Sequence, residues 1–346
     1  MKNKIIFMSN GYKGGATKFQ KQHMDYLLKK NNKIILIDDN PEKTFDKLNK
    51  KIIKVKTAVN KPSIISKKTI NNILNNGERE KILFITNFVF LIKFFFILND
   101  FKKKNKIVLT IHSGILDLNI KTYILGFIFS LIYKMVDNLN FGSNSAKAWW
   151  QSKYPWMNIS NSKVFYNGIN IKKNIKVKKV KKKIKISFIG RLEKENNPDL
   201  FINIAQKYLL KNSNAIFNIF GDGSLVSKLK KKHLSKKIIF HGWCEDRFIY
   251  KKSDIVLITS PINNYPYVAL ESKSYGIPVI SVSKGDIKKI IKNKKDGIIK
   301  YTESTREIIN IINKVIVNYE RFSKNALINV KKFDLNFSCK NFWENL

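Results

Sequence analysis

The sequence predicts an α/β protein made of two domains, each built around a mostly parallel sheet. Short apolar, β-branched runs alternate with stretches of helical periodicity along the whole chain, which is the pattern of repeated strand–helix–strand units. A lysine-rich segment, residues 171–185, interrupts this alternation and is expected to be the linker. The length of 346 residues and the hydrophobic content of 44% are sufficient for two cores.

In the first half, the expected strands are short apolar runs separated by helices. The strands are residues 4–8, 33–39, 52–56, 81–87, 106–113 and 139–141. The helices are residues 16–30, 66–75, 88–101, 120–135 and a stretch that begins after Ser143 or Ser145 as its N-cap. The helix at 120–135 is apolar nearly all round, so it either packs deeply or lies at a membrane surface.

The second half repeats transitions from strand to loop to helix, and its best-defined unit spans residues 255–285. The run IVLITS predicts a buried strand, PINNYP a turn, YVALESKSYG a helix capped by Gly276, and IPVISVS a second strand. The loop therefore lies at the carboxyl end of a strand and leads into a helix N-terminus, where an anion such as a nucleotide diphosphate is favoured. Residues 303–346 are expected to be helical, with a break near 333–338.

The formal net charge of +41 restricts the possible partners. Lysine supplies nearly all of it, and the only arginines are Arg79, Arg191, Arg247, Arg306 and Arg321. Biased composition, an anionic membrane surface and nucleic acid are each compatible with such a charge. Base-specific readers of nucleic acid favour arginine, so its scarcity argues against direct readout of a base sequence.

No segment predicts export or a membrane span. The N-terminal run IIFM is too short for the apolar core of a signal peptide, and no run reaches the length of a transmembrane helix. Cys244 and Cys339 form no metal-binding or redox spacing, which favours a reduced, cytoplasmic chain. No Asp-x-Asp motif or histidine cluster is placed to hold a cation, so neither a metal nor another cofactor is expected.

Three features are candidate ligand contacts on the residues alone. Glu271 lies in the second turn of its expected helix and is either an exposed carboxylate or a hydroxyl acceptor, for instance for a ribose. His112 lies at the carboxyl end of a strand, where it titrates near neutrality, hydrogen-bonds a sugar hydroxyl or has a structural role. Gly11, Gly14 and Gly15 either let the backbone approach a ligand closely or form a plain tight turn.

Several segments, in the right order, resemble retaining GT-B glycosyltransferases of family 4, the glycosyl transferases group 1. They are GYKGGATK, TIHS, FGSNSAK, FYNGIN, IGRLEKENNPDLF, IFGDGS, FHGW and the stretch from Asn263 to Pro278. In that stretch Glu271 matches the second glutamate of the family's two-glutamate signature, and Asn263 replaces the first.

The resemblance implies two Rossmann-like domains facing across a cleft, with a C-terminal helix that crosses back to the N-terminal domain. The implied boundaries are residues 1–170 for the N-terminal, acceptor-side domain, 171–185 for the linker, 186–332 for the nucleotide-sugar-binding domain and 333–346 for the returning helix.

The resemblance also implies roles at the nucleotide end of a donor. Arg191 would bind the donor phosphates, together with Lys194, because Asn196 occupies the position of the family's lysine. Glu271 would accept the ribose hydroxyls. The residues near the nucleotide base would be Trp243 and Cys244.

At the sugar end, the resemblance implies contacts from both domains. His112 would face the donor sugar, and Gly14 and Gly15 would belong to the glycine-rich donor and acceptor loop. Asn263 would contact the sugar with an amide in place of the family's carboxylate, without a negative charge for a developing oxocarbenium ion. The residues lining the sugar and phosphate, partly through main-chain N–H groups, would be Asn264, Tyr265, Pro266, Tyr267 and Val268.

The implied function is transfer of a sugar, with retention, from a nucleotide-sugar to a cell-surface glycan or lipid-linked acceptor. Lipopolysaccharide, capsule or exopolysaccharide synthesis fits this chemistry, with the chain cytoplasmic or peripheral on the inner face of the membrane. A diphosphate leaving group needs no metal when Arg191, a lysine and helix N-termini stabilise it. Two alternatives remain: a nucleic-acid-binding or DNA-glycosylating protein of the same architecture, and a catalytically inactive binding protein. Nucleic acid is the less expected partner, because no nucleic-acid-binding motif accompanies the charge.

Overall fold

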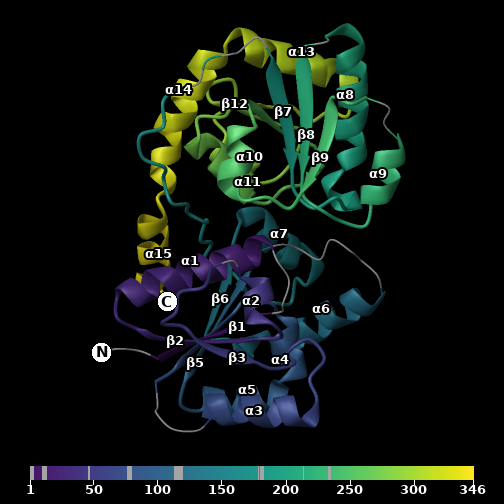
Figure 1. Cartoon of the computed structure of the whole chain (residues 1–346). Coiled ribbons are helices and arrows are strands. Elements are labelled where there is room, and N and C mark those ends of the chain that lie inside the picture. The colour runs from purple at the N-terminus through teal and green to yellow at the C-terminus, as the bar shows by residue number, and fades with distance from the viewer. Residues whose placement is uncertain are drawn as a thin grey trace. The chain divides into compact units, whose positions relative to one another are not determined.

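The computed structural model describes residues 4–9, 14–45, 47–75, 80–112, 120–177, 179, 183–212, 214–232 and 235–346. These residues form two compact units (Figure 1). Unit 1 consists of Met1–Asn167 and Asn336–Leu346, and unit 2 consists of Gly168–Leu335. The end of the segment expected as a linker already belongs to the first strand of unit 2, because Ile184 is buried in the core of that unit.

Unit 1 contains a six-stranded sheet with the strand order β3-β2-β1-β4-β5-β6. Each pair of neighbouring strands in it is parallel. The chain reverses its direction of progress between β1 and β4, which is the switch point of a Rossmann-type sheet. The strands are β1 (Lys4–Met8), β2 (Lys33–Asp38), β3 (Ile53–Lys56), β4 (Ile82–Ile85), β5 (Lys106–Ile111) and β6 (Asn138–Phe141).

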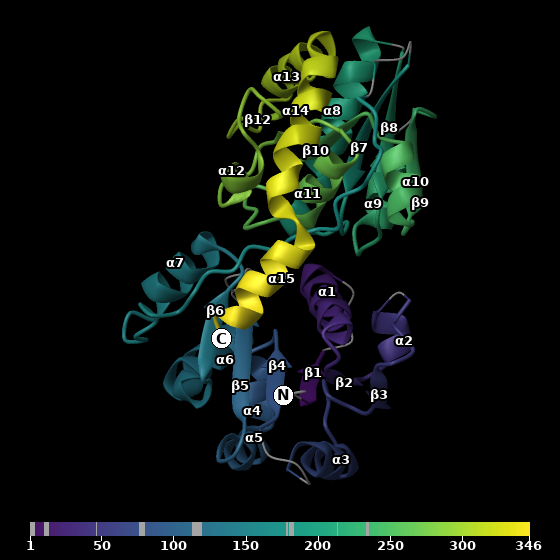
Figure 2. The same cartoon turned by 90° about the vertical axis from the view of Figure 1, so that its left-hand side faces the viewer.

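Helices cover both faces of this sheet. One face packs against α3 to α7 through a continuous apolar cluster, and the other face, which carries Phe7 and Phe84, packs against α1 and α15 (Figure 2). The helices are α1 (Gly15–Lys29), α2 (Pro41–Thr44), α3 (Ile64–Asn75), α4 (Val89–Lys93), α5 (Phe95–Lys102), α6 (Ile120–Ile132), α7 (Asn144–Lys153) and α15 (Leu335–Glu344).

Two expectations for unit 1 are corrected or refined by the structure. The helix expected at 88–101 is divided into α4 and α5, because Phe94 between them leaves helical geometry at φ −117° and ψ 25°. Ser143, rather than Ser145, is the N-cap of α7, since its hydroxyl oxygen accepts a hydrogen bond from the Ala146 amide at 3.0 Å.

The C-terminal helix α15 completes the core of unit 1. The ring centroid of Phe342 lies 5.7 Å from that of Phe84 and 5.9 Å from that of Phe19. The Ser338 hydroxyl donates a hydrogen bond to the carbonyl oxygen of Tyr166 at 2.7 Å. The predicted return of the C-terminal helix to the N-terminal domain is therefore confirmed.

Unit 2 contains a second six-stranded sheet, with the strand order β12-β11-β10-β7-β8-β9 and parallel neighbours. Counted from its own first strand, unit 2 has the same strand order as unit 1, so the chain builds one topology twice. The strands are β7 (Ile184–Ile189), β8 (Ala215–Phe220), β9 (Ile238–Gly242), β10 (Ile255–Ile258), β11 (Val279–Ser281) and β12 (Gly297–Ile299).

The helices of unit 2 alternate with its strands, as the sequence predicts. None of the described helices in either unit is long and apolar enough to cross a membrane. The helices of unit 2 are α8 (Pro198–Lys211), α9 (Val226–Lys232), α10 (Asp246–Lys251), α11 (Tyr267–Ser274), α12 (Ile287–Ile290), α13 (Thr305–Val317) and α14 (Tyr319–Val330).

A fully buried ion pair anchors α11 in unit 2. Lys273 Nζ lies 2.9 Å from Asp296 Oδ2, and both side chains are completely buried. The same ammonium donates a hydrogen bond to the Ile290 carbonyl at 2.6 Å and lies 5.5 Å from the centroid of the Phe333 ring. Asp296 Oδ1 accepts the Lys292 amide at 2.8 Å, so both oxygens of the carboxylate have partners. Burial lowers the pKa of Lys273, whereas Asp296 favours its charged form.

We expect Lys273→Met to destabilise unit 2 strongly, because the substitution leaves the Asp296 carboxylate buried without a counter-charge. Loss of one partner of a buried pair costs about 3–5 kcal/mol of unfolding free energy. Urea unfolding gives the size of the effect, and hydrogen exchange of α11 peptides locates it. Lys300→Met is the matched control, because Lys300 and Glu307 form an exposed pair at 3.9 Å, and such pairs contribute about 1 kcal/mol at most. Equal losses for the two variants would contradict the anchoring role.

Candidate functional site

The carboxyl edge of the unit 2 sheet brings three glycine-containing loops close together. Gly190, Gly221 and Gly242 lie at the ends of β7, β8 and β9, and the Gly190 and Gly221 amides donate to Phe220 O at 2.9 Å and Gly242 O at 2.8 Å. A Cβ atom on Gly221, whose φ is 135°, would lie 1.9 Å from the Gly190 carbonyl oxygen, so only glycine fits there. Ligands of parallel α/β sheets bind at this edge.

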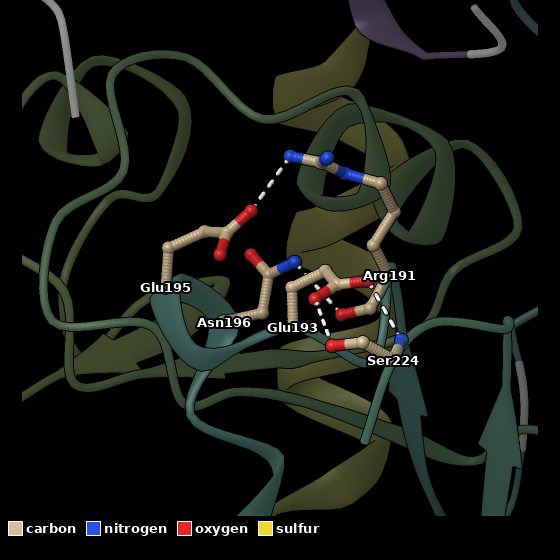
Figure 3. Close-up of polar contacts among 5 residues, drawn as sticks. All are labelled: Arg191, Glu193, Glu195, Asn196 and Ser224. Atoms are coloured by element: carbon tan, nitrogen blue, oxygen red, sulfur yellow. Dashed lines mark hydrogen bonds and ion pairs between the residues drawn. The ribbon is translucent and has the colours of Figure 1, made fainter. Parts of the chain in front are cut away.

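The loop after β7 presents Arg191 to solvent. The Arg191 guanidinium Nη2 lies 2.8 Å from Glu195 Oε1, and both side chains are more than one-third exposed (Figure 3). Asn196 Nδ2 donates to the Arg191 carbonyl at 2.8 Å, and the Thr259 hydroxyl donates to the Asn196 carbonyl at 3.0 Å. The side-chain amide of Asn196 thus closes this loop, and its backbone carbonyl connects the loop to the residue that follows β10.

Glu193 ties the same loop to the loop after β8. Its carboxylate accepts the Ser224 amide at 2.8 Å and the Ser224 hydroxyl at 2.5 Å, and these bonds lower the pKa of Glu193 (Figure 3). A Cβ atom on Gly223 would lie 2.5 Å from the Leu192 carbonyl oxygen, so the two loops are in close contact. Sequence reasoning missed this connection, because Glu193 and Ser224 are 31 residues apart.

In the Arg191 loop, an anionic ligand can replace the Glu195 carboxylate as the partner of the Arg191 guanidinium. An exposed ion pair such as Arg191–Glu195 is worth about 1 kcal/mol or less, whereas a diphosphate offers bidentate, doubly charged contacts to a guanidinium. Lys194 is also exposed, and it forms no ion pair with the described residues. The loop therefore carries two cations that a diphosphate can bind once Glu195 is displaced.

The loop that leads into α11 is fixed by the strands on either side. The Asn263 amide nitrogen of the backbone donates to Lys284 O at 2.9 Å, and Asn263 Nδ2 donates to Ser260 Oγ at 2.9 Å. Pro266 is the N-cap of α11 and provides no side-chain hydrogen bond, and the Ala269 amide donates to the Pro266 carbonyl at 3.1 Å. The positive end of the α11 dipole lies at this loop, where an anion is favoured.

Other predicted residues of this loop differ in how much of the side chain a ligand can reach. Tyr265 and Tyr267 are each only 8% exposed, so their contribution to a ligand comes mainly from the main chain. Asn264, Pro266 and Val268 are half-buried.

Glu271 is held in place by a buried tyrosine that sequence reasoning did not identify. Tyr250 on α10 is 1% exposed, and its hydroxyl donates to Glu271 Oε2 at 2.7 Å. Burial, followed by the neighbouring Glu271 charge, raises the pKa of Tyr250 well above its ordinary value, so the phenol remains a neutral donor. Tyr275 stacks on Tyr250 with ring centroids 4.8 Å apart. The Tyr250 hydroxyl thus orients the Glu271 carboxylate, and Glu271 remains partly exposed.

The residues expected near a nucleotide base follow β9. Trp243 is 59% exposed, and Cys244 is half-buried with its thiol 3.5 Å from the His241 carbonyl oxygen. An exposed indole at this edge of the sheet offers a flat apolar surface to a planar ligand.

In unit 1, the glycine-rich loop is described only in part. Gly11 lies outside the described residues, Gly14 precedes α1 and Gly15 begins it. The Thr17 hydroxyl accepts the Gly14 amide and donates to the Gly14 carbonyl, both at 2.9 Å. A Cβ atom on Gly14 would meet nothing within 4 Å, so packing inside the chain does not require this glycine.

His112 lies at the end of β5, as predicted, but it does not titrate near neutrality. Burial lowers its pKa from 6.5 to about 4, and its buried Nε2 atom has no hydrogen-bond partner among the described residues. Its ring lies 4.6 Å from that of Phe19, which also contacts His23 at 4.1 Å. Burial, reinforced by His112, lowers the pKa of His23 to about 3. His112 is therefore a neutral imidazole near pH 7. It can donate or accept a hydrogen bond but does not supply a charge.

Comparisons with known proteins identify a family and relatives that this chain resembles. Residues 170–328 match the family model described as Glycosyl transferases group 1. An uncharacterized 41.2 kDa protein in the cps region of Klebsiella pneumoniae is 25% identical over 176 residues, which are 47% of this chain and 48% of that protein. The UDP-Gal:alpha-D-GlcNAc-diphosphoundecaprenol alpha-1,3-galactosyltransferase of Escherichia coli is 29% identical over 166 residues, 43% of each protein. The chain thus matches less than half the length of these two relatives.

Among solved structures, Anabaena HepE in complex with UDP-glucose is similar over 99% of this chain and 100% of that chain. The TM-score is 0.78 and the sequence identity 14%. With its two six-stranded parallel sheets, the chain has the GT-B fold. Within that fold, the match of residues 170–328 to the glycosyl transferases group 1 model agrees with the family that the sequence motifs resemble.

We expect acid to destabilise unit 1 through its two buried histidines. Their pKa values are about 3 and about 4 in the folded chain and 6.5 ordinarily, so the unfolded chain binds more protons between pH 6.5 and pH 4. Stability is therefore complete above about pH 6.5 and falls as the pH drops, on the order of 2–3 kcal/mol per histidine by pH 4. His23→Phe, placed among aromatic rings, should flatten this dependence in urea unfolding at pH 7 and pH 4. An equal loss of unfolding free energy between pH 7 and pH 4 in the wild type and the variant would contradict this role of His23.

We also expect Glu195→Gln to raise the affinity of the chain for nucleoside diphosphates. The substitution frees the Arg191 guanidinium and removes a negative charge that opposes the ligand, so Kd should fall about two- to fivefold. Calorimetry with UDP, GDP and ADP measures the change. Glu320→Gln is the matched control, because Glu320 is exposed in the first turn of α14, whose Tyr319 bonds the carbonyl of Asp254 at the amino end of β10. An equal change in both variants would contradict the role of Glu195.

Proposed function

We propose that this chain is a glycosyltransferase that moves a sugar, with retention, from a nucleotide-sugar to a glycan or lipid-linked acceptor. The observation that carries the proposal is the convergence of Arg191, the α11 N-terminus and the fixed Glu271 at one edge of the unit 2 sheet. These groups match the chemistry of a nucleoside diphosphate, which has an anionic centre and a ribose with two hydroxyls. The family match over residues 170–328 supports the same reading.

Each group at this edge has a distinct task in the proposed reaction. When the bond from the anomeric carbon to the diphosphate breaks, negative charge develops on the departing oxygen. Arg191, Lys194 and the positive end of the α11 dipole stabilise that charge, which is the largest electrostatic demand of the step. Glu271, oriented by Tyr250, accepts hydrogen bonds from the ribose hydroxyls and fixes the donor. These groups suffice without a metal ion.

We assign one further contact with a sugar to each unit, through His112 in unit 1 and Asn263 in unit 2. His112 is neutral near pH 7, so it contributes a hydrogen bond to a sugar hydroxyl rather than a charge. The side-chain amide nitrogen of Asn263 donates a hydrogen bond to the Ser260 hydroxyl, and this bond holds the Asn263 side chain in the loop before α11. Its amide oxygen is a neutral acceptor where the family has a carboxylate, so Asn263 tunes the choice of donor sugar. Retention requires the acceptor hydroxyl to bond the face from which the diphosphate leaves.

The acceptor belongs to surface-polysaccharide synthesis in this proposal. One relative is encoded in a cps region, and another is named for transfer to a sugar-diphosphoundecaprenol. A lipid-linked acceptor places the reaction at the cytoplasmic face of a membrane, where the net charge of +41 favours anionic lipid.

The donor-site prediction concerns Arg191→Ala and Glu271→Ala. Removal of a charge-assisted contact costs about 1.5–3 kcal/mol, so Arg191→Ala should weaken binding of nucleotide-sugars and nucleoside diphosphates roughly ten- to a hundredfold. Glu271→Ala should weaken the binding of every ligand that carries a ribose. Inorganic pyrophosphate has no ribose, so it should bind this variant and the wild type with the same affinity. Calorimetry with UDP-, GDP- and ADP-sugars measures both effects.

Arg306→Ala controls for the general attraction of anions to this basic chain. Arg306 is exposed on α13, and its loss removes the same charge outside the candidate site. If Arg191→Ala and Glu271→Ala both bind every nucleotide as tightly as the wild type does, the donor site lies elsewhere. Sugar transfer by the wild type, followed by NMR of the anomeric proton, tests the activity and its retention. An inverted product would rule out retention while leaving the donor site intact.

A further inference from the structure

Among the described residues, helix α6 of unit 1 has an apolar face that is exposed. Its exposed side chains recur at intervals of three or four residues, so they lie on one side of the helix. The opposite side is anchored, because Phe129 is fully buried and its ring lies 5.1 Å from Phe88 and 5.2 Å from Trp150. The exposed apolar residues of α6 are Ile120, Tyr123, Ile124, Phe127 and Leu131.

An exposed tryptophan from the segment after α7 extends this face. Trp156 is 53% exposed, its ring centroid lies 5.9 Å from that of Phe127, and its Nε1 donates to the Ser130 hydroxyl at 3.0 Å. The ring of Tyr123 on α6 lies 6.4 Å from that of Tyr154. Tryptophan and tyrosine concentrate where a hydrocarbon layer meets water, because their rings are apolar and their tips polar.

Basic residues predominate in the segments that form this face. Residues 120–136 and 144–156 contain Lys121, Lys134, Lys147 and Lys153 but no Asp or Glu. Lys134 follows α6 and is exposed, and Lys153 ends α7 three residues before Trp156 and is also exposed. An apolar helix face with aromatic residues and basic flanks suits an anionic bilayer surface, on which the helix lies in the plane.

We infer that the exposed face of α6, together with Trp156, binds the surface of an anionic phospholipid bilayer. The other strongly apolar helical stretch of unit 1, residues 88–101, packs inward instead, because its Phe90, Phe94 and Leu98 are buried in the unit 1 core. The 13 residues of α6 are too few to span a bilayer, which fits a helix lying on it. The inference deepens the proposal of a lipid-linked acceptor, yet its test needs no enzymatic activity.

The test compares Leu131→Glu with Leu210→Glu in the full-length chain. Both leucines are exposed on helices, at 60% and 86%, but Leu210 is on α8 of unit 2 and is not part of the proposed surface. Sedimentation with vesicles of phosphatidylcholine and phosphatidylglycerol gives the partition coefficient. Leu131→Glu should lower it roughly tenfold, the value of one buried leucine side chain, and Leu210→Glu by less than about twofold. Equal partitioning of the two variants would overturn the inference.

Two further measurements separate this inference from its rivals. Brominated lipids should quench part of the tryptophan fluorescence of the wild type, and Trp156→Phe should lose most of that quenching; unchanged quenching would overturn the inference. Sedimentation velocity without vesicles should show Leu131→Glu and the wild type in the same oligomeric state. A wild-type dimer that Leu131→Glu dissociates would assign the face to a second copy of the chain instead. Unchanged binding of UDP by Leu131→Glu, measured by calorimetry, would show that a loss of lipid binding leaves the donor site intact.

Discussion

The buried ion pair between Lys273 and Asp296 is the constraint on which the candidate site depends. Lys273 is on α11, the same short helix whose N-terminus favours an anion and whose Glu271 meets Tyr250. A helix of eight residues has little stability of its own, so its position must come from tertiary contacts. The ion pair binds one side of α11 to the turn before β12. A buried charge without its partner is far more costly than an absent one, which makes this arrangement specific as well as stable.

Some polar side chains around Arg191 hold the loop together, whereas another forms a contact that a ligand can replace. Glu193 and Asn196 use their oxygen and nitrogen atoms to close the loop and to join it to its neighbours, as Figure 3 shows. Glu195 instead forms an exposed contact that a stronger anion can replace. Asn196 therefore has a structural role in this loop, because its side-chain amide donates to the Arg191 carbonyl and its backbone carbonyl accepts the Thr259 hydroxyl.

Much of the fold could be predicted from the sequence, because parallel strands buried on both faces appear as short apolar, β-branched runs. The return of the last helix to unit 1 came from the family resemblance and from the break near Phe333. The division of the helix at Phe94 was not predictable, since both of its parts are equally apolar. The pKa of His112 depends on burial beside Phe19, and the partner of Glu271 is 21 residues away, so neither follows from local pattern. Helix α6 was correctly identified as apolar, but only the packing of Phe129 shows which side faces inward.

The position of α15 has a consequence for how the chain is made. Ribosomes deliver a polypeptide from its N-terminus, and domains generally fold as units while synthesis continues. Unit 1 begins the chain but takes Phe342 from its far end, where that ring covers Phe84 and Phe165 at 5.7 Å and 4.8 Å. Unit 2, whose residues are contiguous, can therefore reach its native state while the older half still exposes an uncovered aromatic surface. The first domain to emerge is the last to be finished, and during that interval it depends most on chaperones.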